Sequence, residues 1–146
     1  EILEVLCQEF PHSEFSILLT LRGLTIDIPY YIPKQEVTGS SVDLTEDITG
    51  LIEKFKVFCH RHPFSHGKPT FSAPDRETHV RNFPVSLLIG NNPKNMTASI
   101  RVTFQGQEII LETEVKLLET KRKKKLRGME NIQYKLLRGD LYEYFG

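Results

Sequence analysis

Four residues with metal-binding side chains lie near the middle of the sequence: Cys59, His62, His66 and, further along, His79. The Cys59-x2-His62-x3-His66 spacing suits zinc, because short separations let side chains converge on one ion. It supplies only half of a structural site, since a fourth ligand would have to come from Cys7 or His79, outside any second pair. We therefore interpret the segment as the histidine-rich end of a helix, and we predict no metal and no cofactor.

A second group of chemically active side chains follows in Asp75, Glu77 and His79. Two carboxylates beside an imidazole can divide acid and base roles when burial separates their pKa values. The segment is rich in proline, and Arg76 and Arg81 are ready partners, so we predict an exposed surface with salt bridges. Neither cysteine belongs to a reactive signature, and there is no Gly-x-Ser-x-Gly. The sequence therefore favours a protein that is not an enzyme.

The densest charge is one basic run, which holds six of the nineteen Lys and Arg residues: Lys121, Arg122, Lys123, Lys124, Lys125 and Arg127. Because the formal net charge is zero, the remainder of the chain is acidic. Such a run is typical of a nuclear import signal, a contact for an acidic partner or a solvated surface. It also suits the phosphates of nucleic acids and, less well, an anionic membrane surface. No aromatic residue interleaves with it, which weakens a base-stacking interpretation. Nucleic-acid binding through this run remains the alternative.

The C-terminal aromatic residues Tyr142, Tyr144 and Phe145 form a third candidate contact. Tyr and Phe often anchor interfaces, so this tail is interpreted either as a docking segment or as the last element of the core.

Length and composition limit the class of protein. A chain of 146 residues with 39% hydrophobic residues is expected to form one domain with a packed core, spanning 1–146. No apolar run approaches the roughly 20 residues that cross a bilayer, so we expect no membrane partner. Two cysteines are too few for a disulfide scaffold and are expected to be buried free thiols. Since the chain begins at Glu1, we expect it to be excised from a larger protein.

Hydrophobic periodicity predicts the order of elements. The spacing at 1–10 predicts a short amphipathic helix, and that at 43–60 a longer one whose stripe includes Ile48, Leu51, Ile52 and Phe55. Alternation predicts hairpins at 16–28 and 99–115, with a strand at 85–89. Residues 61–84 are expected to be irregular. The region 118–137 fits a helix, although Ile132, Tyr134 and Leu136 also alternate as in a strand.

These elements predict an α+β fold, with two to three helices packed on one face of a mostly antiparallel sheet built from two hairpins. We expect a protein-interaction domain that belongs to an intracellular protein. The lysine run indicates that this protein is nuclear. A nucleic-acid-binding domain and a metal-dependent enzyme at Cys59, His62 and His66 are the alternatives. Another protein is the expected partner, and the oligomeric state is left open.

Overall fold

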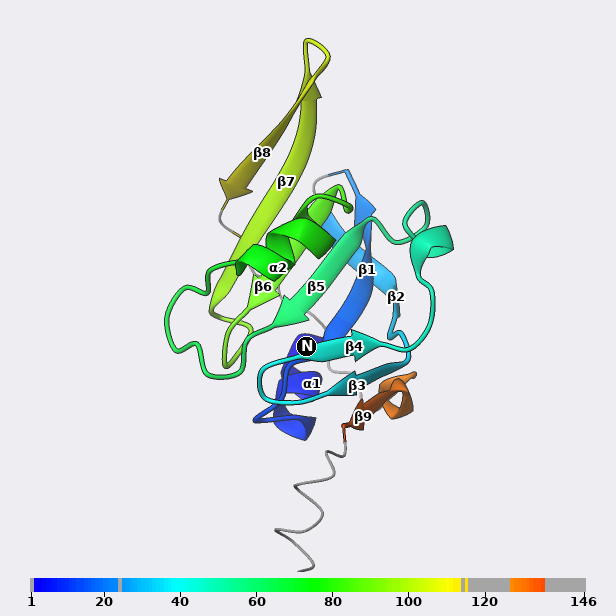
Figure 1. Ribbon diagram of the computed structural model, residues 1–146, viewed down its shortest axis with the longest axis vertical. Coiled ribbons are helices and arrows are strands. Elements are labelled where there is room, and N and C mark those ends of the chain that lie inside the picture. Colours follow the sequence, from blue (N-terminus) through cyan, green and yellow to red (C-terminus); the bar gives the residue numbers. More distant parts are fainter. Residues whose placement is uncertain (1, 24, 114, 116–126, 136–146) are drawn as a thin grey trace, which may run out of the picture.

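The computed structural model describes residues 2–23, 25–113, 115 and 127–135, and this part of the chain is mostly β-structure. The described residues form nine strands in two sheets. Figure 1 shows their arrangement. The large sheet contains β1 (Ser16–Arg22), β2 (Thr25–Tyr31), β5 (Val57–Arg61), β6 (Val85–Ile89), β7 (Met96–Phe104) and β8 (Gln107–Thr113). The small sheet contains β3 (Gln35–Val37), β4 (Val42–Leu44) and β9 (Ile132–Tyr134). The helical segments are α1 (Ile2–Glu9), η1 (Thr49–Leu51), α2 (Ala73–Asp75), η2 (Arg76–Val80) and η3 (Met129–Asn131).

The large sheet has the strand order β2-β1-β5-β6-β7-β8. All of its neighbouring strands are antiparallel except β5 and β6, which are parallel. Parallel neighbours need a crossover connection, and here α2 and η2 lie within that connection. The proline-rich segment between β5 and β6 is therefore a crossover that carries a helical segment across the sheet.

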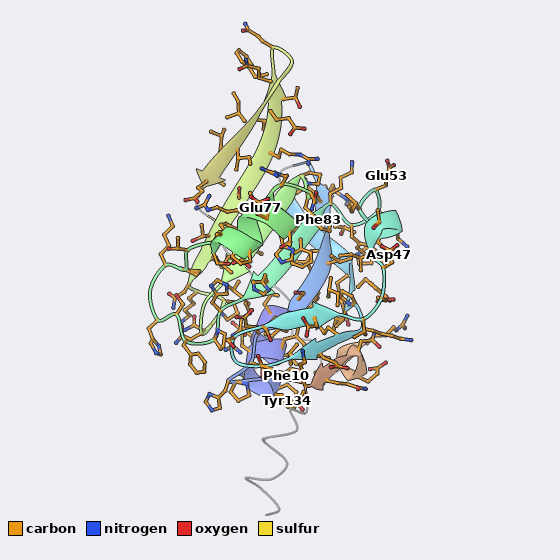
Figure 2. All side chains as sticks on the ribbon, in the orientation of Figure 1. Phe10, Asp47, Glu53, Glu77, Phe83 and Tyr134 are labelled. Atoms are coloured by element: carbon orange, nitrogen blue, oxygen red, sulfur yellow. The ribbon has the colours of Figure 1, made fainter. Side chains whose placement is uncertain are left out.

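The two faces of the large sheet are covered by different elements. On one face, Leu6, Cys7 and Phe10 from the α1 region pack with inward residues of β1, β5 and β6, and the small sheet adds Val37 and Ile132. On the other face, Phe71 and Val80 from the crossover pack on Leu88, and a cluster around Phe58 joins the segment that carries η1. Figure 2 shows Phe10 close to Tyr134 of β9, with ring centroids 5.6 Å apart.

Several predicted elements are confirmed. The first helix is α1, and the hairpins are β1–β2 and β7–β8. The second hairpin turns at Gln105 and Gly106, both with positive φ, as a two-residue turn matched to strand twist requires. The strand at 85–89 is β6. Cys7 and Cys59 are buried free thiols, as expected.

The predicted fold class is wrong, because only one α-helix of eight residues is present among the described residues and both sheets contain a parallel pair. The largest error is the helix at 43–60, where the structure has β4, the 3-10 turn η1 and β5. Its apolar residues do pack together, around Leu18, Phe58 and Phe83, but from an irregular segment and a strand. Apolar residues spaced three and four apart can pack together either from one helix or from an irregular segment followed by a strand. The spacing alone therefore did not establish the predicted helix.

Two further predictions are corrected. The described part of the expected C-terminal helix is η3 followed by β9, which pairs in parallel with β3, so the strand alternation at Ile132 and Tyr134 was the correct signal. The segment 61–84 is not wholly irregular, because α2 and η2 lie within it. Among the described residues, no helix combines the length and the apolar character needed to span a bilayer.

Candidate functional site

A cluster of buried polar side chains lies where the crossover packs on the large sheet. It draws Glu14 from the segment before β1, His60 from β5, His62 from just after β5, and Asp75 from α2. Alternation along β5 directs Phe58 and His60 to the crossover face, whereas Val57 and Cys59 belong to the core on the α1 face. The positions of these histidines are therefore fixed by a central strand of the sheet.

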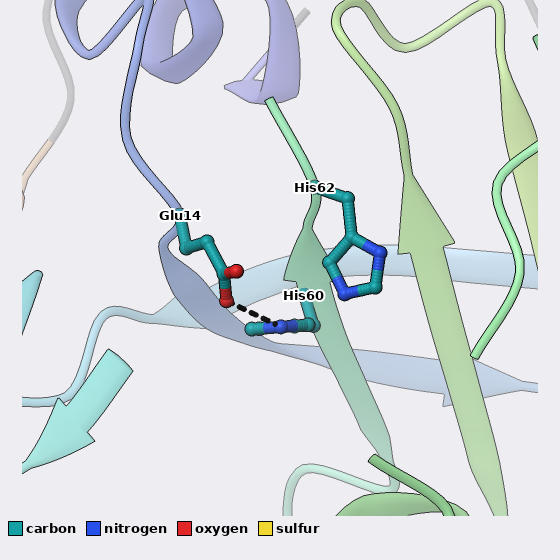
Figure 3. A group of neighbouring side chains, drawn as sticks. All are labelled: Glu14, His60 and His62. Carbon is teal, nitrogen blue, oxygen red and sulfur yellow. Dashed lines mark ion pairs between the residues drawn. The ribbon is translucent and has the colours of Figure 1, made fainter. Parts of the chain in front are cut away.

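The contacts within this cluster are short. His60 Nε2 lies 2.9 Å from Glu14 Oε1 and 3.5 Å from Asp75 Oδ1, while His62 Nε2 lies 3.1 Å from Asp75 Oδ2. Figure 3 shows the Glu14 carboxylate against the edge of His60, with His62 beside them. The side chains of Glu14, His60 and Asp75 are at most 12% exposed, and that of His62 is 24% exposed. The cluster therefore reaches solvent mainly at His62.

Asp75 is held in place by the start of its own helix. Ser72 and Asp75 form a capping box, in which the Asp75 N–H donates to Ser72 Oγ and the Ser72 N–H donates to Asp75 Oδ2. Burial alone would raise the pKa of the Asp75 carboxyl, but hydrogen bonds from His62 and from the Ser72 N–H hold that pKa below its usual range. The same Asp75 contact raises the pKa of His62 above its ordinary value, against the opposing effect of burial.

His79 extends the cluster on the far side of His60. Its ring stacks on Phe58 with centroids 3.9 Å apart, and lies 5.5 Å from the His60 ring. Burial, followed by the neighbouring His60, lowers the pKa of His79 to about 4. His79 is therefore a neutral, stacked side chain at neutral pH.

The structure does not bring Cys59, His62, His66 and His79 together as one zinc site. Cys59 lies on the opposite face of β5, fully buried, and burial raises the pKa of its thiol strongly. His66 is exposed and contacts the Asn91 amide. His62 and His79 both belong to the buried cluster. The histidine-rich segment is thus a strand end and its following loop, not the end of a helix as predicted.

The expectation that Asp75 lies on an exposed surface is also wrong, since Asp75 is buried. Glu77 does behave as predicted, because it is exposed and pairs with Arg81 at 3.2 Å. Sequence reasoning missed Glu14 and His60 and gave Asp75 the wrong environment. Two signals were available: His60-x-His62 at strand spacing, and Ser72-x-x-Asp75 as a capping box before a helical turn.

The two other predicted contacts fall mainly outside the described residues. This applies to Lys121, Arg122, Lys123, Lys124 and Lys125 of the basic run and to Tyr142, Tyr144 and Phe145 of the aromatic tail. Arg127 is described and exposed, and its backbone N–H donates to the hydroxyl of Tyr30 at 2.7 Å.

An open cleft of about 440 Å³ lies between the segment carrying η1 and the segment carrying η2. Ile48 and Ile52 line one side, and His79 and Phe83 line the other. Glu14, His60, His62 and Asp75 do not belong to its lining. The cleft therefore borders the histidine cluster at His79 without exposing the groups that contact one another there.

The second distinctive feature is a projecting arm, which we define as residues 101–110 of the β7–β8 hairpin. β6 pairs with β7 only as far as Ile100, so the arm continues as a two-stranded ribbon beyond the sheet. Figure 1 shows the hairpin extending away from the body at the end opposite α1. All seven residues of β8 are exposed, and within the described part of the chain β8 is the last strand of the sheet. Its outer edge therefore presents backbone groups that can pair with another strand.

The faces of this hairpin differ in polarity. Residues directly opposite in an antiparallel pair share a face, and the pairs Ile100–Leu111, Val102–Ile109 and Phe104–Gln107 define one face that is largely apolar. Ala98, on the same face, belongs to the core. The other face carries the pairs Ser99–Glu112, Arg101–Ile110 and Thr103–Glu108. The apolar face is thus the outward continuation of the core face.

Neither the scan of protein-family models nor the search of curated proteins returned a match for this chain. The arm and the histidine cluster are therefore the features of this chain from which a function can be inferred.

Proposed function

We propose that this chain is a non-enzymatic protein-interaction domain that docks a partner protein on the apolar face of the β7–β8 hairpin. The observation that carries the proposal is the exposure of that face. Phe104 is 62% exposed and Leu111 is 52% exposed, while Val102 and Ile109 are 36% and 39% exposed. Clustered large apolar side chains at the surface commonly mark an interaction site, whereas scattered ones need no explanation.

These apolar side chains continue the core face of the sheet. They follow Ala98 along the core face, so their alternation is that of a strand with one buried face. On the opposite face, Glu112 pairs with Arg76 at 3.1 Å, as suits a surface in contact with water. A partner on the apolar face would therefore bury the side chains that the alternating pattern places on that face.

We infer that the partner contributes an extended segment that pairs with the outer edge of β8. Strand addition combines main-chain hydrogen bonds along the edge with side-chain contacts at alternate positions, and here those positions are Ile109 and Leu111. The segment expected to fit is apolar at every second residue. Lys121 to Arg127 remains a proposed electrostatic contact or import signal, and the nuclear location remains a prediction.

Matched substitutions on the two faces of the arm test the proposal. The apolar-face variant carries Val102→Thr and Phe104→Lys, and the control carries Thr103→Lys and Ile110→Thr on the other face, so that each adds one positive charge and replaces one aliphatic side chain by Thr. Wild type and both variants are used as baits in nuclear extract, and captured proteins are quantified by mass spectrometry. We expect wild type and the control to capture the same set of proteins. The apolar-face variant should capture at least about tenfold less of each of them.

Equal capture by the two variants would contradict the proposal. Sedimentation of the purified wild type measures its oligomeric state, and so shows whether the partner is a second copy of this chain. If the wild type is a dimer and the apolar-face variant is a monomer, the apolar face mediates self-association and does not dock a different protein. Circular dichroism confirms that each bait is folded, which is expected because all four positions are at the surface.

A further inference from the structure

We propose that Glu14, His60 and His62 bind one divalent ion of the zinc class, with the Asp75 carboxylate completing the ligand set. One ligand atom from each of the first three residues lies within 4.8 Å of the other two. Imidazole nitrogen and carboxylate oxygen are both ordinary zinc ligands. The inference is independent of the arm, because it depends only on the residues that the crossover brings to β5.

Three of the distances between donor atoms are close to those around one ion. Donors 2.0–2.2 Å from a tetrahedral zinc are separated from one another by about 3.3–3.6 Å. The separations here are 2.9 Å for His60–Glu14, 3.5 Å for His60–Asp75 and 3.1 Å for His62–Asp75. The group in which every donor lies within 4.8 Å of the others is Glu14, His60 and His62. Asp75 is outside that group and contacts the two histidines through different oxygens, so its carboxylate would have to rotate or shift to become the fourth ligand.

The charge of the cluster also favours a cation. Glu14 and Asp75 are two nearly buried carboxylates, and their ion-pair partners among the described residues are the imidazoles of His60 and His62. Buried charge is costly unless it is fully paired. Neighbouring arginines are engaged elsewhere: Arg61 bonds backbone carbonyls, and Arg76 and Arg81 pair with other acidic residues. With neutral imidazoles the two carboxylates leave a charge of −2, which one divalent ion balances.

The surroundings orient the donors as metal sites require. A histidine that ligates through one ring nitrogen usually donates a hydrogen bond from the other, which fixes its tautomer. His60 Nδ1 lies 3.4 Å from Ser16 Oγ, which leaves Nε2 directed toward the two carboxylates. Gln35 fixes Ser16 in turn, because its side chain bonds both the N–H and the carbonyl of Ser16. The capping box holds Asp75 in the same way.

Such an ion would have a structural role. Its ligands come from the segment before β1, from β5 and its end, and from the crossover helix, so one ion would join three parts of the chain. The side chains of Glu14, His60 and Asp75 are almost fully buried. An ion held by them and by His62 would leave little room for a substrate.

The test uses untagged protein, stripped of metal with a chelator and titrated with Zn²⁺ by calorimetry. The ligand variants are His62→Ala and Glu14→Gln, and the control is His66→Ala, which removes an exposed histidine close in sequence. We expect one Zn²⁺ per chain and a higher melting temperature for wild type and control. Each ligand variant should lose more than about 100-fold in affinity, and Ser16→Ala should lose about 10–100-fold.

Co²⁺ provides a second readout, because a nitrogen and oxygen site gives visible absorption that the ligand variants should abolish. The inference is overturned if wild type binds no stoichiometric Zn²⁺, or if His66→Ala removes binding while the ligand variants retain it. Chemical unfolding of metal-free protein checks that His62→Ala folds, as its 24% exposed side chain leads us to expect.

Discussion

His60 Nε2 and Glu14 Oε1 lie 2.9 Å apart, joining a central strand of the large sheet to the segment that enters its neighbour β1. This contact closes one side of a cluster whose other side is Asp75 from the crossover. The fold thus gathers, on one sheet face, polar groups that are distant in the sequence. The opposite face carries the core and continues outward as the apolar face of the arm.

The first prediction concerns the cap that positions Asp75. Ser72→Ala removes the oxygen that accepts the Asp75 N–H, and we expect a loss of about 1 kcal/mol in the free energy of unfolding. Ser72→Thr keeps an accepting oxygen and should lose less than half of that. Urea unfolding of the three proteins measures the difference, and equal stability of the alanine and threonine variants would show that the cap contributes nothing.

The second prediction concerns Arg61, which is 2% exposed and, among the described residues, donates hydrogen bonds to four backbone carbonyls. Arg61→Met keeps apolar packing but leaves those buried acceptors without their donor, so we expect a loss of about 3–5 kcal/mol. Arg81→Met, at an exposed position, should change stability by less than about 0.5 kcal/mol. Similar small changes in stability for Arg61→Met and Arg81→Met would contradict a stabilising role for the hydrogen bonds of Arg61. The carbonyls belong to Phe10, Ser13, Gly90 and Asn91.

The third prediction concerns the close approach of two loops at Gly90. A Cβ atom at Gly90 would lie 2.5 Å from the Ser65 carbonyl oxygen, so Gly90→Ala must displace backbone and should cost about 1–3 kcal/mol. A Cβ at Gly67 meets nothing within 4 Å, and Gly67→Ala should stay within about 1 kcal/mol of wild type. Thermal unfolding compares the two, and equal effects would be inconsistent with the close approach.

The fourth prediction concerns alkaline pH. The Tyr31 hydroxyl donates to Glu46 Oε1 at 2.6 Å, and this bond raises the pKa of Tyr31 because it favours the protonated phenol. The resulting stabilisation is present below about pH 10 and is lost as pH rises through the folded-state pKa. In Glu46→Ala, tyrosinate absorbance from Tyr31 should develop at lower pH than in wild type. Tyr31→Phe identifies that component, and an unchanged titration would contradict the prediction.

The elements predicted correctly from the sequence are those specified by nearby residues. Both hairpins carry a turn glycine between alternating strands, and α1 has a short apolar stripe. β5 was missed because all five of its residues are buried, so neither face left a polar alternation to detect. Its parallel pairing with β6 depends on the crossover, which no local pattern specifies.

The histidine cluster was missed for a related reason. Once β5 is assigned as a helix, His60 and His62 point in different directions, whereas on a strand they share a face. Glu14 and Asp75 reach them only through the β1–β5 pairing and the crossover. The exposure of the arm could not be foreseen either, because a hairpin with one apolar face is usually covered by the rest of the domain.

Site-specific photo-crosslinking tests whether the apolar face of the arm is the docking surface. A photoreactive phenylalanine analogue is placed at Phe104 in one protein and at Thr103, on the opposite face of the same ribbon tip, in another. We expect the Phe104 probe to form a discrete adduct with a protein other than this chain in extract, and the Thr103 probe to form none. Adducts of equal yield from both positions, or none from Phe104, would contradict it.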